Sequence, residues 1–104
     1  MSGNAPEIVL PQLPKARVAI ISSSWHLDIC NDLIAGAQRA LKAASISDVE
    51  VIYVPGSFEI PLAAQLAFEK GFSAVVAVGL VLEGQTPHFD YVCQGVTQGV
   101  MDVS

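Results

Sequence analysis

A near-continuous apolar run at residues 74–82, rich in valine and interrupted only by Gly79, constrains the fold more than any other feature of the chain. A strand that is covered on both faces has this pattern, and such strands belong to parallel sheets with helices on either side. Gly84 breaks the run, and Thr86 and Pro87 then suit the cap and the first position of a helix. We therefore expect a buried strand that leads into a helix beginning at Pro87.

The part of the chain before this strand alternates between strand and helix patterns. Apolar strand patterns at residues 17–22 and 49–54 are each followed by a helical pattern, at residues 28–44 and 59–70. Strands that alternate with helices of this length form parallel βαβ units with right-handed crossovers. The sequence predicts an α/β domain over residues 17–104, with a parallel sheet between two layers of helices.

The first predicted helix has a wide apolar stripe with spacings of three and four residues. We expect it to be buried along most of one side, through Ile29, Cys30, Leu33, Ile34, Ala37, Ala40, Leu41 and Ala44. Residues 1–16 differ, because three prolines surround a strand-like piece at residues 7–10. They are predicted to form an N-terminal arm, whose short edge strand could join its own sheet or a neighbour's.

Composition argues against several classes of function. A chain of 104 residues fits one domain. Hydrophobic residues make up 52% and charged residues only 14%, so part of the apolar excess is expected to face other subunits. The net charge is −5 and the five basic residues are spread thinly. This argues against nucleic-acid binding, which needs a clustered basic face.

Membrane and metal functions also lack a sequence signal. The N-terminus shows no basic segment before an apolar core, and the longest apolar run is too short to span a membrane. We expect a cytoplasmic protein without a membrane partner. Cys30 and Cys93 are far apart and have no metal-ligand spacing around them. Two small buried residues in a reducing compartment are therefore favoured over a disulfide or a zinc site.

Three strand-to-helix junctions carry the chemistry. They contain Ser24-Trp25-His26, Gly56-Ser57-Phe58-Glu59 and Gly84-Gln85-Thr86-Pro87-His88. In an open parallel sheet the carboxyl ends of the strands lie on one edge, so a pocket is expected between these loops. Ser57 can cap the second helix, and Gly56 allows close approach of a ligand to the backbone. The free N–H groups at the last helix start are suited to a phosphate or carboxylate.

Each side chain that suggests chemistry also has a structural interpretation. Trp25, the only tryptophan, could stack on a heteroaromatic substrate or could be an interface or core aromatic. His88 could act as a general acid and base or could simply bond to a neighbour at the helix start. Glu59 could accept hydrogen bonds from a ligand, but a first-turn carboxylate already suits the helix dipole. For His26, a solvated loop histidine is the favoured interpretation.

Taken together, the three junctions resemble those of lumazine synthase, the penultimate enzyme of riboflavin biosynthesis. The motifs Ser24-Trp25-His26, Val54-Pro55-Gly56-Ser57-Phe58-Glu59-Ile60-Pro61 and Gly84-Gln85-Thr86-Pro87-His88-Phe89-Asp90-Tyr91-Val92 occur in family order at family-like spacing. The resemblance implies a flavodoxin-like three-layer α/β/α fold. It also implies a homopentamer, or an icosahedral shell of pentamers, with active sites between subunits and with riboflavin synthase as a partner.

The resemblance also implies a transferase reaction and a role for each site residue. The reaction condenses 5-amino-6-ribitylaminouracil with 3,4-dihydroxy-2-butanone 4-phosphate, giving 6,7-dimethyl-8-ribityllumazine, phosphate and water, without a metal or organic cofactor. His88 would move protons, and Trp25 would stack on the pyrimidine. By the same resemblance, the other substrate-binding residues would be Gly56, Ser57, Phe58, Glu59, Val81, Leu82, Gln85 and Thr86.

The chain departs from the family pattern in two ways. Glu83 stands where the family usually has arginine. The family also continues beyond the position of Ser104 with a strand, a helix and basic residues of the phosphate site, so the resemblance implies that the C-terminal part of the fold is missing from this chain. These departures leave an alternative open, a non-catalytic relative that binds lumazine or flavin or forms a shell.

Overall fold

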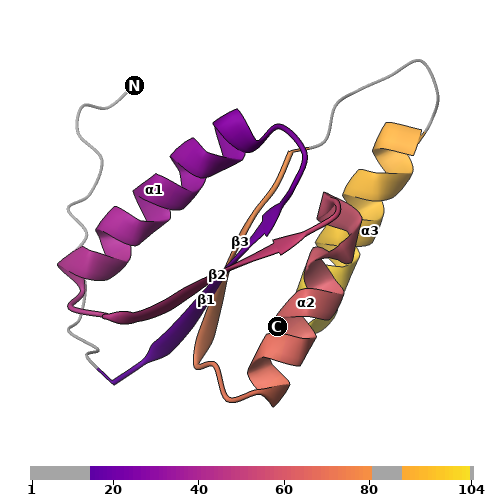
Figure 1. The fold of residues 1–104 in the computed structure, drawn as a ribbon. Coiled ribbons are helices and arrows are strands. Elements are labelled where there is room, and N and C mark those ends of the chain that lie inside the picture. The colour runs from indigo at the N-terminus through magenta and orange to yellow at the C-terminus, as the bar shows by residue number, and fades with distance from the viewer. Residues whose placement is uncertain (1–14, 81–87, 104) are drawn as a thin grey trace, which may run out of the picture.

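The computed structural model describes residues 15–80 and 88–103 and shows strands and helices in alternation. The order is β1 (Arg17–Ser23), α1 (Leu27–Ala43), β2 (Asp48–Val54), the 3₁₀ turn η1 (Ser57–Glu59), α2 (Ile60–Glu69), β3 (Ala74–Val78) and α3 (His88–Val103). The strands form a parallel sheet in the order β2-β1-β3. Figure 1 shows α1 on one side of this sheet and α2 and α3 on the other. The predicted flavodoxin-like α/β arrangement is confirmed.

The core lies on both faces of the central strand β1. Ala19 and Ile21 are fully buried on the side of α2, where they belong to a cluster with Ile60, Ala64 and Ala67 of that helix. Val18 points to the other face and packs with Ala44 and Ile46, which follow α1. Successive side chains of a strand point to opposite faces, so a strand between two helical layers must be apolar throughout. This explains why residues 18–21 of β1 are all apolar.

One expected boundary is wrong, while the other predicted boundaries that fall on described residues agree within one residue. The strand predicted over residues 74–82 ends at Val78, and residues 81–87 lie outside the described part of the chain. The ladder between β1 and β3 ends at the pair of Ser22 with Val78, one residue before β1 itself ends at Ser23. The helix predicted over residues 59–70 runs from Ile60 to Glu69, and a 3₁₀ turn at Ser57–Glu59 precedes it.

The buried face of α1 is narrower than predicted. Cys30 and Ile34 are buried, but Ile29 and Leu33 remain 44% and 47% exposed. The side of α1 that packs against the sheet follows Cys30, Ile34 and Leu41, and the positions one residue earlier lie toward solvent. Cys93 is also less buried than expected, and both cysteines are free thiols. The predicted arm falls on residues 1–16, of which 1–14 lie outside the described residues.

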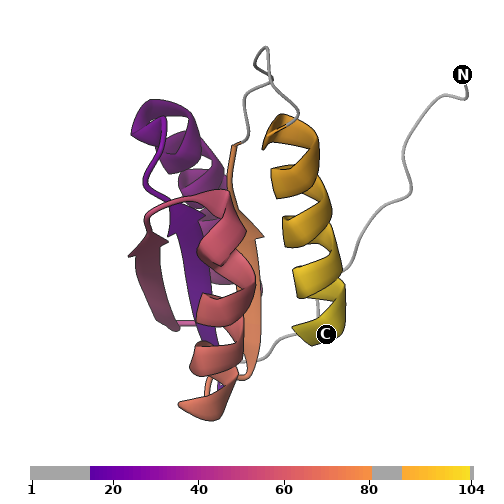
Figure 2. The same cartoon turned by 90° about the vertical axis from the view of Figure 1, so that its right-hand side faces the viewer.

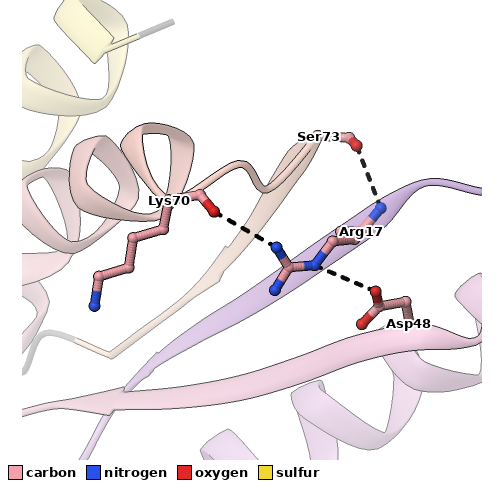
Figure 3. Close-up of polar contacts among 4 residues, drawn as sticks. All are labelled: Arg17, Asp48, Lys70 and Ser73. Carbon is pink, nitrogen blue, oxygen red and sulfur yellow. Dashed lines mark hydrogen bonds and ion pairs between the residues drawn. The ribbon is translucent and has the colours of Figure 1, made fainter.

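Arg17 links several segments at the amino end of the sheet. Its Nε lies 3.2 Å from Asp48 Oδ2 on β2, and its Nη1 donates to the carbonyl of Lys70 after α2 at 3.5 Å. Its backbone N–H donates to Ser73 Oγ at 3.2 Å, and the guanidinium lies 4.3 Å from the centre of the Phe72 ring. Figure 3 shows that the polar partners approach Arg17 from different elements. One side chain thus connects β1, β2 and the segment between α2 and β3.

Candidate functional site

The first two junctions are tied to each other at the carboxyl edge of the sheet. β1 ends at Ser23 and β2 at Val54. Both the backbone N–H and the hydroxyl of Ser24 donate to the carbonyl oxygen of Val54, each at 2.8 Å. The turn after β1 is therefore fixed against the end of β2, as expected for loops that leave the same edge of a parallel sheet.

Trp25, Gly56 and Glu59 come together at this edge. A side chain at position 56 would place its Cβ 3.8 Å from Cδ1 and Nε1 of the Trp25 ring, and 3.1 Å from Glu59 Oε2. Gly56 was expected to let a ligand approach the backbone closely. In the structure, the groups that approach it are an indole and a carboxylate of the chain itself. The Trp25 side chain remains 66% exposed, so most of its ring is free to meet a ligand.

Ser57 does not act as the predicted cap. Its hydroxyl donates to the carbonyl oxygen of Leu80 at 3.3 Å, and the residue is only 7% exposed. The position before α2 is Glu59, which makes no side-chain cap hydrogen bond. A serine hydroxyl can cap a helix or bond to another carbonyl, and here the fold brings the Leu80 carbonyl, two residues after β3, within its reach. Ser57 therefore connects the second junction to the segment that follows β3.

Phe58 contacts α3. Its side chain is 58% exposed, yet its ring lies so close to Gly95 that a Cβ at that position would collide with it. Pro61 approaches Gly99 in the same way, with 2.6 Å between its Cγ and a Cβ built at that glycine. Figure 2 shows α2 and α3 running side by side. Phe58 and Pro61 thereby hold α3 against η1 and the start of α2.

A pocket of about 230 Å³ lies between the second junction, the end of β3 and α3. Its walls are mainly apolar, and it extends from the buried Ser57 to the inner face of α3. The sequence did not identify the α3 residues that form one wall of this pocket. They recur at spacings of three and four residues, which places side chains on one face of a helix and could have indicated them. The pocket is lined by Ser57, Ile60, Ala77, Val78, Gly79, Cys93, Val96 and Thr97.

The third predicted group of site residues falls largely outside the described part of the chain. Val81, Leu82, Gln85 and Thr86 belong to residues 81–87. His88 is the first residue of α3, and the structure describes its backbone but not its side chain. In Figure 1 the start of α3 lies at the same end of the molecule as the carboxyl ends of β1 and β3. The helix that begins with His88 therefore starts at the same end of the molecule as the first two junctions.

Within residues 15–80 and 88–103, no group of three or more His, Cys, Asp or Glu side chains could hold a metal ion. No helix among these residues is long and apolar enough to cross a membrane. Among the predicted site residues whose side chains the structure describes, Glu59 is the one that carries a charge. Its carboxylate lies beside the indole. The described half of the site therefore combines an exposed aromatic plane with one carboxylate, a combination that suits a flat ligand carrying N–H donors.

Comparison with known proteins identifies what the chain is similar to. The family model for 6,7-dimethyl-8-ribityllumazine synthase matches residues 15–104. The 6,7-dimethyl-8-ribityllumazine synthase of Streptomyces coelicolor is 49% identical over 105 residues, which cover 100% of this chain and 65% of the relative. That of Arthrobacter sp. is 51% identical over 110 residues, covering 100% of this chain and 68% of the relative. The chain thus spans about two thirds of the length of these relatives.

Proposed function

Because the chain belongs to the 6,7-dimethyl-8-ribityllumazine synthase family, we propose that it catalyses the formation of 6,7-dimethyl-8-ribityllumazine. The substrates in this proposal are 5-amino-6-ribitylaminouracil and 3,4-dihydroxy-2-butanone 4-phosphate, and phosphate and water are released. The observation that carries the proposal is the meeting of Trp25, Gly56 and Glu59 at the carboxyl edge of the sheet. These residues come from two junctions more than thirty positions apart, and the proposed chemistry needs them in one place.

The pyrimidine would bind at the described half of the site. The exposed face of Trp25 offers a stacking plane, and the absence of a side chain at Gly56 leaves the indole accessible. The Glu59 carboxylate would accept hydrogen bonds from N–H groups of the uracil or hydroxyls of the ribityl chain. Ser57 would contribute through the position of its loop, since its hydroxyl is already bonded to Leu80. Val81 and Leu82 would line the same pocket.

The phosphorylated substrate would bind at the start of α3. Gln85 and Thr86 would hold the phosphate together with backbone N–H groups at the helix start, where the dipole favours an anion. His88 would move protons as the substrate amine condenses with the ketone and as phosphate leaves. An imidazole suits both steps, because it can accept a proton in one and donate it in the next near neutral pH.

The function is proposed to belong to a homo-oligomer, either a pentamer or a shell of pentamers, in the cytoplasm. The isolated chain exposes several large apolar side chains on its helices, including Ile29, Leu33, Leu62 and Leu66. Apolar surface in such amounts is typical of a protein that buries it against other subunits. Riboflavin synthase is the proposed partner of the assembly. Sedimentation equilibrium of the purified chain should give a mass that is a multiple of five subunits.

Incubation of the protein with both substrates tests the function. We expect lumazine absorbance to appear, and His88→Ala to reduce the rate about 10²- to 10⁴-fold, as is usual for loss of a general acid and base. The pyrimidine substrate should quench Trp25 fluorescence equally in both proteins, which controls for folding of the variant. Quenching without turnover in the wild-type chain would instead favour the non-catalytic relative. Equal turnover with and without His88 would exclude the assigned catalytic role.

A further inference from the structure

The Trp25 ring is poorly fixed by packing. It occupies the three-residue turn between β1 and α1, and its side chain is 66% exposed. A ring that stacks on a substrate binds more tightly when it is already held in the binding orientation, because less conformational entropy is lost on binding. The orientation of this indole must therefore depend on its backbone.

Both peptide groups of Trp25 are held by buried side chains. Its N–H donates to Ser23 Oγ at 3.3 Å, and its carbonyl oxygen accepts a hydrogen bond from the Cys30 thiol at 3.4 Å. Ser23 and Cys30 are both 0% exposed, one at the end of β1 and the other in the first turn of α1. The two partners belong to different elements of the core, so together they fix the direction in which the Trp25 side chain leaves the backbone.

The following residue explains why such fixation is needed. His26 has φ 51° and ψ 57°, the left-handed conformation that residues other than glycine rarely adopt. Its side chain makes no cap hydrogen bond to α1. A strained residue persists when surrounding contacts over-determine it. The His26 carbonyl accepts from the N–H of Cys30 at 3.0 Å, while the Cys30 thiol bonds the preceding carbonyl. Cys30 therefore holds two successive carbonyl groups of the strained turn.

We propose that Ser23 and Cys30 are positioning residues that hold Trp25 in its stacking orientation beside Gly56 and Glu59. This inference rests on the proposed function, in which Trp25 stacks on the pyrimidine. Stacking contributes to the bound substrate and to the transition state alike, so its loss should raise KM for the pyrimidine and leave kcat nearly unchanged. A merely structural role would instead reduce the amount of folded protein without this separation of the two constants.

The single tryptophan makes the proposal directly measurable. Time-resolved fluorescence anisotropy of Trp25 should show faster local motion in Ser23→Ala and Cys30→Ala than in the wild type. Each variant should also raise KM for the pyrimidine about three- to tenfold, the effect of losing one modest hydrogen bond. Cys30→Ser keeps a donor at this position and should restore both values toward the wild type. Ser73→Ala is the matched control for Ser23→Ala, because its side chain lies at the amino end of the sheet, away from this turn.

Circular dichroism would establish that each variant is folded before its anisotropy is compared. Wild-type anisotropy in both folded alanine variants would overturn the proposal. If one of them does not fold, the other decides, since each bond acts on a different peptide group of Trp25. Loosening of Trp25 in a protein without any turnover would support the positioning role and reject the proposed function. The positioning role and the proposed function can therefore be rejected independently of each other.

Discussion

The two ends of the parallel sheet use their side chains in different ways. At the amino end, the polar groups around Arg17 pair with one another, and the guanidinium also covers the Phe72 ring (Figure 3). At the carboxyl end, the hydroxyls of Ser24 and Ser57 donate to backbone carbonyls, and the aromatic rings of Trp25 and Phe58 stay more than half exposed. Among the described residues, the groups of the first end thus pair with one another, whereas the second end leaves most of two aromatic side chains exposed.

This difference indicates where stability and function can be separated. A side chain whose groups are all paired within the fold contributes to the free energy of unfolding and has little left for a ligand. A ring held only through its backbone contributes little to unfolding and much to binding. Substitutions at the amino end should therefore change stability alone, and exposed residues at the carboxyl end should change binding alone.

Gly79→Ala should have the largest effect, because it affects both properties. A Cβ at this position would lie 3.2 Å from Ile60 Cδ1 and would collide with the Ser57 hydroxyl. Ser57 would have to move, and its bond to the Leu80 carbonyl would be lost. We expect a decrease of about 1–3 kcal/mol in the free energy of unfolding, as for other overpacked sites. Urea titration followed by circular dichroism would measure it, and pyrimidine binding should weaken as the loop shifts.

Gly36→Ala is the matched control for this substitution. Its Cβ would meet only Arg39 Nη2, at an ordinary 3.6 Å, in the middle of α1. Replacing an interior helical glycine with alanine should stabilise the protein by about 0.5–1 kcal/mol. Opposite signs for the two substitutions would support the steric explanation. Equal stabilisation by both would show that the space between Ser57 and β3 is not limiting.

Trp25→Ala should separate binding from stability. Because the side chain is 66% exposed, we expect the free energy of unfolding to change by less than about 0.5 kcal/mol. The Kd for the pyrimidine substrate should rise about ten- to hundredfold, the usual effect of losing an aromatic stacking plane. Isothermal titration calorimetry would measure it, since the variant has no tryptophan fluorescence. A large loss of stability with unchanged Kd would contradict the separation between the two ends.

The sequence predicted the fold and the meeting of the first two junctions because both follow from short-range patterns. Parallel strands end at one edge, so Trp25 and Gly56 had to come close once the strands were assigned. The hydroxyl of Ser57 could not be assigned in this way, because its acceptor at Leu80 is twenty-three residues away and competes with the local cap. The contact between Phe58 and Gly95 likewise depends on how α3 packs, which no local pattern determines.

Arg17→Ala should have the smallest effect and should leave the carboxyl end unchanged. The Arg17 and Asp48 side chains are 44% and 58% exposed, so their ion pair is screened by solvent and contributes little by itself. Together with the lost contact to Phe72, we expect the free energy of unfolding to fall by about 1 kcal/mol. Asp48→Asn removes only the charge and should cost less than half of that. Thermal unfolding would rank the two variants. The Kd for the pyrimidine should stay at the wild-type value in both, because the contacts of Arg17 with residues 15–80 and 88–103 do not reach the turn that carries Trp25. A shift in this Kd would show that the two ends are coupled through β1.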